Sequence, residues 1–233
     1  MKDASEVTII GGGLAGCEAA WQLLSSGINV NLYEMRPKHK TAAHSTSKLC
    51  ELVCSNSFRS DDYKTNAIGL LHEEMRRAGS LIMHAADNNQ VPAGGALAVD
   101  RDAFSSCVQK MLLERPGFNL IRQELPRLPL LKEGPYIFAT GPLTSDSLSL
   151  DIINVTGESS LAFFDSIAPV IYKDSIDFTK AWFQSRYDKV GPSGDKAAYI
   201  NCELTENEYH IFIESLLEAD IKSFKEWEKN TPY

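Results

Sequence analysis

The sequence has no long apolar run, no excess of basic residues and no leader-like start. Its longest apolar stretches, such as VTII and FIESLL, are far too short to cross a bilayer. No basic segment followed by an apolar one opens the chain, so a secretion signal is not expected. The net charge of −8 argues against nonspecific nucleic-acid binding by the chain as a whole. These features predict a cytoplasmic protein with no membrane association.

The acidic residues are unevenly distributed. Residues 203–233 hold eight Asp or Glu against three Lys, so this segment carries most of the negative charge. Basic patches remain at RPKHK, residues 36–40, and at the Arg76–Arg77 pair. A solvated surface is the ordinary explanation of such patches, and local binding roles stay open.

The five cysteines and five histidines form neither a disulfide framework nor a metal-binding set. An odd number of irregularly spaced cysteines indicates a reducing compartment. Cys50 and Cys54 are separated by three residues, and a disulfide across one helical turn is geometrically unfavourable. Cys17 and Cys107 lie on apolar faces of expected helices, as buried thiols do. Cys54 and Cys202 remain candidate nucleophiles with polar or helix-starting neighbours, although spacing alone also allows structural thiols.

The stretch VTIIGGGLAGCEAAWQLLSSGINVNLYE, residues 7–34, is typical of a dinucleotide-binding βαβ unit. A strand precedes G-x-G-x-x-G, a helical pattern follows, and the next strand ends at an acid. Gly11 permits the tight turn, Gly13 admits a pyrophosphate, and Gly16 allows close helix–strand packing. The pyrophosphate would lie at the helix N-terminus, and Glu34 could accept hydrogen bonds from a ribose. The predicted cofactor-binding residues here are Gly11, Gly12, Gly13, Leu14, Ala15, Gly16, Glu34 and Arg36.

Two helices and a second turn follow. Residues 37–64 show no clear period and predict loops. Residues 66–78 predict a helix whose apolar face includes Leu70 and Leu71, and Asp100 is placed to cap another helix. Further on, YIFATGP predicts a strand and turn that return to the same dinucleotide through Thr140 and Gly141. An ordinary strand and turn is the alternative.

The pattern changes after residue 145. Short β-rich segments such as SLAFF and APVIY alternate with loops, and a Gly/Pro-rich turn leads into a strand that reaches Cys202. Thr205 and Glu208 match a capping box, which predicts a helix start. That helix is expected to bury the apolar residues Tyr209, Phe212, Ile213, Leu216 and Leu217.

Nine stretches, in order along the chain, resemble the folate- and FAD-dependent tRNA (uracil-5-)-methyltransferases of bacteria, which are related to the glucose-inhibited-division flavoproteins. They are TIIGGGLAGCEAAWQL, LYEMRP, ELVCSNSFRS, LLHEEMRRAGSLI, VPAGGALAVDRDAFS, ATGPLTSDSL, FFDSIAPVI, SRYDK and YINCELTENEY. The resemblance spans essentially the whole chain, and CSNSFRS and ATGPLTSD are specific to the methyltransferase branch. One departure is Glu203, which follows Cys202 where the family usually has proline.

The resemblance implies an α/β fold of the two-dinucleotide-binding flavoprotein type, with an inserted mixed α+β region. Residues 1–145 would form the Rossmann-like FAD-binding domain with inserted loops. Residues 146–233 would start an insertion or substrate domain that is incomplete here. Family members are nearly twice as long, so the chain is expected to be truncated at the C-terminus.

The resemblance also implies a reaction. The target would be a T-loop uridine of tRNA, or ribosomal RNA as in some relatives. Methylenetetrahydrofolate would supply the one-carbon unit, reduced FAD the electrons, and NAD(P)H would reduce the flavin again. The family's two cysteines match Cys54 in CSN and Cys202 in NC. Attack by the Cys202 thiolate at carbon 6 of uracil would make carbon 5 nucleophilic, with Cys54 beside the flavin.

Two other functions remain open. The dinucleotide signature alone also suits an FAD/NAD(P)H-dependent oxidoreductase that acts on a small molecule. The length and the acidic segment suit a non-catalytic FAD-binding or RNA-binding fragment. The sequence leaves open the oligomeric state and the choice between NADH and NADPH.

Overall fold

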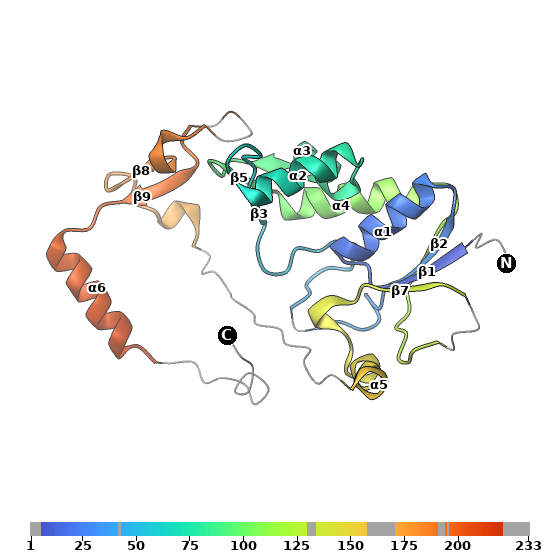
Figure 1. Ribbon diagram of the computed structural model, residues 1–233. Helices are drawn as coiled ribbons and strands as arrows, with labels where there is room; N and C mark the ends of the chain where they lie inside the picture. The colour runs from blue at the N-terminus through green and yellow to red at the C-terminus, as the bar shows by residue number, and fades with distance from the viewer. Residues whose placement is uncertain are drawn as a thin grey trace.

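The structure is a computed structural model whose central element is a four-stranded sheet in the order β6-β2-β1-β7 (Figure 1). It describes residues 6–41, 43–129, 134–157, 171–190, 194 and 196–220. The strands of the sheet are β1 (Glu6–Ile10), β2 (Asn29–Tyr33), β6 (Phe118–Ile121) and β7 (Tyr136–Phe138). All its pairings are parallel. In chain order the strands run 3-2-1-4, as in doubly wound dinucleotide-binding sheets.

Helix α1 (Leu14–Ser25) joins β1 to β2 and confirms the predicted βαβ unit. Its buried residues, Gly16, Cys17 and Ala20, recur at helical spacing, as expected for the face of a helix that packs on a sheet. Gly27 then takes a left-handed φ of 76°, which favours glycine and lets the chain turn into β2.

Between β2 and β6 the chain builds helices α2 (Ala67–Arg77), α3 (Leu81–Asn88) and α4 (Arg101–Leu113). It also builds an antiparallel sheet of β3 (Ser57–Ser60), β5 (Ala96–Val99) and β4 (Gln90–Val91). Helices α3 and α4 contact α1, and α4 also contacts β6 (Figure 1). Asp100 caps α4 as predicted, since its side chain accepts a hydrogen bond from Ala103 N. Strand β3 lies in the stretch that was expected to be loops.

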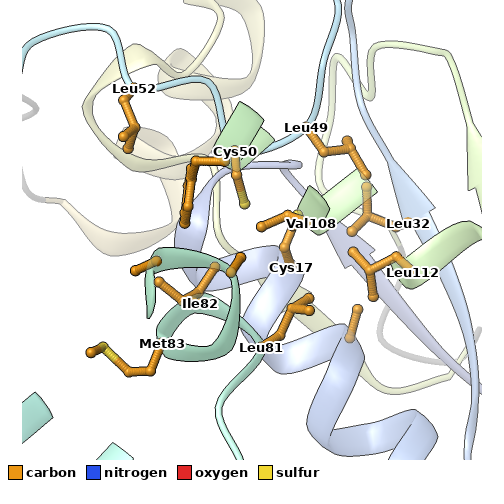
Figure 2. Close-up of a cluster of buried hydrophobic side chains, with 14 of the residues drawn as sticks. Cys17, Leu32, Leu49, Cys50, Leu52, Leu81, Ile82, Met83, Val108 and Leu112 are labelled. Atoms are coloured by element: carbon orange, nitrogen blue, oxygen red, sulfur yellow. The ribbon is translucent and has the colours of Figure 1, made fainter. Parts of the chain in front are cut away.

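One hydrophobic core joins these layers. Figure 2 shows side chains of α1, α3, α4, β2 and the segment before Cys54 meeting in it. The segment contributes Leu49, Cys50 and Leu52, which are buried although the backbone there is irregular. Residues 49–52, which precede Cys54, are therefore anchored in the core and do not form a surface loop.

The prediction for α2 is wrong about which face is buried. Leu70 and Leu71 are 47% and 50% exposed, whereas Gly69 and His72 are buried. Gly69 lies so close to the preceding loop that a Cβ would collide with its backbone, and His72 Nδ1 lies 2.8 Å from Asp61 Oδ1. Close backbone packing and a buried polar pair therefore decide the orientation of this helix.

Beyond β7, a 3₁₀ turn (Gly141–Leu143) leads into helix α5 (Asp146–Thr156). No pattern in the sequence predicts α5. Its Leu148 is buried and faces the carboxyl ends of the parallel strands. The predicted division of the chain at residue 145 stays a prediction. The predicted strand segment SLAFF lies outside the described residues, as does most of APVIY.

Farther along, β8 (Ala181–Gln184) and β9 (Tyr199–Cys202) form an antiparallel pair, followed by helix α6 (Glu206–Glu218). The capping box of α6 is confirmed, with Thr205 and Glu208 as its members. The expected burial of its apolar face is wrong for this chain, because Phe212 is 53% and Leu217 78% exposed. Figure 1 shows α6 standing apart from the parallel sheet. None of the helices in the described ranges is long and apolar enough to span a membrane.

Candidate functional site

A cleft opens at the carboxyl ends of the parallel strands. Beside β1 the chain winds to β2 in one direction and to β7 in the other. Such a switch point is where open α/β sheets bind their ligands. The lining residues are Ile10, Gly11, Gly13, residues 33–36, His44, Glu51, residues 123–125, Thr140, Leu143, Ser145 and Leu148.

The glycine loop after β1 combines tight packing with one open position. A Cβ at Gly16 would lie 1.9 Å from the Gly11 carbonyl oxygen, and one at Gly11 would lie 2.5 Å from the Ala139 carbonyl oxygen. A Cβ at Gly13 would meet no atom within 4 Å. Gly11 and Gly16 therefore allow the loop to pack, while Gly13 borders open space in the cleft wall.

Helix α1 begins at this open position. Its N-cap is Gly13, no side chain caps it, and its first turn contains no acid. The first N–H groups of a helix lack intrahelical partners, so this end suits an anion such as a pyrophosphate. Leu14 and Ala15, which follow the cap, are both exposed.

Glu34 ends β2 in a buried network with Arg36. Its Oε1 accepts hydrogen bonds from Arg36 N at 3.0 Å and Arg36 Nε at 2.9 Å. Its Oε2 accepts from Gly12 N at 3.1 Å and from a terminal nitrogen of Arg36 at 3.0 Å. Burial alone would raise the pKa of Glu34, but its hydrogen bonds with Arg36 and Gly12 outweigh burial and hold the pKa below its usual value. The carboxylate thus fixes the glycine loop.

Glu51 is a second carboxylate on Arg36 and was not predicted from the sequence. Arg36 donates to Glu51 Oε2 at 2.8 Å, and the side chain of Arg36 is only 2% exposed. Ser45 donates to Glu51 Oε1 from N at 2.8 Å and from Oγ at 2.7 Å. Thr46 N donates to both carboxylate oxygens. Burial raises the pKa of Glu51, but the hydrogen bonds from Ser45 and Thr46 outweigh it, leaving the pKa at about 2.

We expect Glu51 to make the fold acid-sensitive. Its pKa falls from 4.5 to about 2 on folding. A carboxyl group of this kind stabilises the fold above the higher value and loses that contribution as the pH falls toward the lower one. The free energy of unfolding of the natural chain should therefore exceed that of Glu51→Gln by less at about pH 3 than at about pH 6. Urea titrations of both chains across this range would measure it, and a pH-independent difference would contradict the assignment.

Cys50 holds the neighbouring backbone to the glycine loop. Cys50 N donates to Gly12 O at 2.9 Å, and its thiol contacts Gly13 O at 3.5 Å. Ser105 donates to the Cys50 carbonyl at 3.0 Å. Complete burial, and then a contact with the Cys17 thiol, raise the pKa of Cys50 well above its usual value. Its burial and these contacts give Cys50 a structural role.

His44 also lines the cleft and was missed in the sequence, because it lies in a stretch without periodicity. Its Nδ1 lies 2.8 Å from Thr41 Oγ1. Burial and the nearby positive charge of Arg36 lower the pKa of His44, although Glu51 and Glu34 act in the opposite direction. The ring is therefore neutral near pH 7.

The second predicted turn lies on the opposite side of the cleft. Ala139 N donates to Ile10 O at 2.8 Å, which joins the end of β7 to the end of β1. Thr140 lines the cleft, and its hydroxyl accepts from Thr144 Oγ1 at 2.7 Å. Gly141 has φ +61°, as the tight turn requires.

The structure does not bring the two candidate nucleophiles into this cleft. Cys54 is exposed, and Arg101 donates to its carbonyl at 3.1 Å. Cys202 is exposed at the end of β9 and lines a second pocket, together with Lys173, Lys180 and other residues. The cleft is lined by five of the predicted cofactor-binding residues, Gly11, Gly13, Glu34, Arg36 and Thr140. Across the ranges that the structure describes, no three His, Cys, Asp or Glu side chains could hold a metal ion.

Known proteins resemble this chain over nearly its whole length. Two of these similar proteins are named methylenetetrahydrofolate–tRNA-(uracil-5-)-methyltransferase TrmFO. The one from Rhodopseudomonas palustris (strain BisB18) is 60% identical over 227 residues, which are 97% of this chain and 48% of the relative. The one from Nitrobacter hamburgensis is 61% identical over 229 residues, which are 98% of this chain and 48% of the relative. The chain therefore spans about half the length of the curated relatives it matches.

Two further comparisons concern the fold and the family. A solved structure of Aquifex aeolicus GidA aligns with a TM-score of 0.43 at 15% identity, covering 54% of this chain and 20% of that one. A family model described as glucose inhibited division protein A matches residues 6–233. Because this match extends from β1 to the last residue of the sequence, the chain belongs to the glucose inhibited division protein A family.

Proposed function

We propose that this chain is the FAD-binding part of a folate- and FAD-dependent tRNA (uracil-5-)-methyltransferase. The observation that carries the proposal is the identity of about 60%, over 97–98% of the chain, with relatives that bear this name. The cleft at the switch point of the parallel sheet supports it, because a dinucleotide needs a site of this kind. The division into residues 1–145 for FAD and 146–233 for a substrate region is part of the proposal.

The residues of the cleft fit the pyrophosphate and ribose portion of FAD. Gly13 borders open space at the uncapped start of α1, where backbone N–H groups suit a pyrophosphate. Gly12, Leu14, Ala15 and Gly16 complete this loop and its first helical turn. Glu34, Arg36, Thr140 and Gly141 are proposed to flank the ribose and the return side of the site. Bound and reduced, FAD would supply the electrons that convert a methylene group to a methyl group.

The two exposed cysteines are the proposed catalytic residues. The Cys202 thiolate would add to carbon 6 of a T-loop uridine, so that carbon 5 becomes nucleophilic and takes the one-carbon unit of methylenetetrahydrofolate. Loss of the carbon 5 proton, cleavage of the bond between the one-carbon unit and the folate nitrogen, reduction of the methylene group by two electrons from reduced FAD and elimination of the Cys202 thiolate would release the methylated base and tetrahydrofolate. Cys54 would serve beside the flavin, and NAD(P)H would be the reductant. A ribosomal RNA target is the second candidate. A cytoplasmic location is part of the proposal, because tRNA is modified there.

The test is trapping of a covalent RNA complex. A full-length protein containing this sequence should form an adduct with a T-arm RNA that carries 5-fluorouridine, because fluorine at carbon 5 blocks the elimination. Cys202→Ala should abolish the adduct, whereas Cys107→Ala, a change on the partly buried face of α4, should leave it in place. An adduct that persists in Cys202→Ala would refute the assignment of the nucleophile.

Transfer of label separates the alternative functions. Label from methylenetetrahydrofolate should appear in tRNA and not in a small molecule, which excludes the small-molecule oxidoreductase. Transfer by the purified 233-residue chain itself would exclude a non-catalytic FAD-binding or RNA-binding module. Label found in ribosomal RNA instead of tRNA would favour the second candidate target.

A further inference from the structure

We propose that Glu51 is a positioning residue that links occupancy of the dinucleotide cleft to the placement of the segment carrying Cys54. The proposal rests on the proposed function, since it takes the cleft as a dinucleotide site and Cys54 as a functional thiol. Glu51 lines the cleft but is not one of the proposed FAD-binding residues. Its carboxylate contacts Arg36 in the cleft wall on one side and Ser45 and Thr46 on the other.

The first step concerns the acceptor capacity of Glu34. A carboxylate offers about four lone-pair positions, and Glu34 already receives four donors. Two of them are the backbone N–H groups of Gly12 and Arg36, and two belong to the guanidinium of Arg36. A ribose diol can therefore bond to Glu34 only when guanidinium donors withdraw.

The second step concerns the carboxylate that pairs with the Arg36 guanidinium once Glu34 is released. The Arg36 side chain is buried, and a buried charge without a partner is strongly destabilising. Glu51 Oε2 already accepts from Arg36 at 2.8 Å and keeps the charge paired when the bonds to Glu34 are released. When the cleft is filled, the Arg36 guanidinium thus gives up hydrogen bonds to Glu34 and stays paired with Glu51.

The third step transmits this shift along the chain. The backbone of Cys50 is fixed on the core side by Gly12 and Ser105. Cys54 lies three residues beyond Glu51, and the exposed Arg101 donates a hydrogen bond to its carbonyl oxygen. Leu52 is also held in the core, but Glu51, Ser45, Thr46 and Arg101 line one small pocket. A movement of the Glu51 carboxylate therefore reaches Cys54 through the side chain of Arg101. Filling of the cleft changes the surroundings of the Cys54 thiol.

The experiment measures alkylation of Cys54 with and without saturating FAD, by peptide mass spectrometry on the 233-residue chain. Cys202 in the same sample is the internal reference, because it is exposed in a different pocket. In the natural chain FAD should change the Cys54 rate by about fivefold, the lower end of usual coupling factors. In Glu51→Gln, FAD should still bind and the change in rate should disappear. Loss of fold alone would not remove the response to a ligand that still binds.

Two further variants sharpen the result. Glu73→Gln removes the partner of the exposed Arg77, a 2.8 Å pair outside the cleft, and should keep the full response. Ser45→Ala removes a single hydrogen bond to Glu51 and should reduce the response even if Glu51→Gln does not fold. The coupling alone is overturned if the alkylation rate of Cys54 does not change when FAD binds. It is also overturned if FAD changes that rate equally in the natural chain, Ser45→Ala and Glu51→Gln. Absence of FAD binding to the natural chain contradicts the proposed cofactor site as well as the coupling.

Discussion

Replacing Gly16 with alanine is expected to destabilise the fold by about 3 kcal/mol and to remove binding of FAD. The new Cβ would lie 1.9 Å from the carbonyl oxygen of Gly11, which is backbone and cannot rotate away. Helix α1 would have to move off the glycine loop, and the same movement would misplace the N–H groups proposed for the pyrophosphate. Urea unfolding and flavin fluorescence titration measure the two effects.

Gly13→Ala is the matched control three residues earlier. Its Cβ would meet no atom within 4 Å, so we expect a change in stability below about 1 kcal/mol. The methyl group would nevertheless occupy the open space of the cleft, and FAD binding should fall. If Gly13→Ala lost as much stability as Gly16→Ala, the difference in packing between the two positions would be contradicted.

Replacing Phe104 with alanine is expected to lower the free energy of unfolding by about 3–5 kcal/mol. The side chain is completely buried in α4, and its ring lies 5.5 Å from that of Phe58. Its removal leaves a cavity between α4 and the small antiparallel sheet, which cannot collapse without moving β3. Equilibrium unfolding in urea, followed by circular dichroism, gives the value.

Leu113→Ala provides the comparison on the same helix. Leu113 is 54% exposed at the end of α4, so its truncation should cost less than about 1 kcal/mol. Equal losses in the two variants would mean that α4 does not pack in the described orientation.

The βαβ unit could be predicted because its signals are local. The glycine spacing, the helical recurrence of Cys17 and Ala20, and the acid after β2 all lie within one short stretch. The orientation of α2 could not be predicted, because apolar periodicity favoured Leu70 and Leu71 while a glycine contact and a buried His–Asp pair decided the packing. Tertiary contacts of polar residues leave no periodic trace in a sequence.

The cleft likewise combines residues that the sequence predicts with residues that it does not. The glycine motif and the second turn predict Gly13, Glu34 and Thr140. Glu51 and His44 were not predicted, because both lie in a stretch with no period and reach the cleft through irregular backbone. The sequence also suggested that Glu34 is available to a ribose, whereas Arg36 and Gly12 occupy all its acceptor positions. That role for Glu34 stays a prediction.

The order of the parallel sheet has a consequence for how the chain folds. Strand β1 pairs at once with its neighbour β2, but its other partner, β7, comes only after three helices and a separate small sheet. Pairing across such long sequence separation is slow, because the entropy of a large loop is lost before contacts compensate it. The two walls of the cleft therefore meet late in folding. A ligand that contacts both walls can therefore bind only after β7 has joined the sheet.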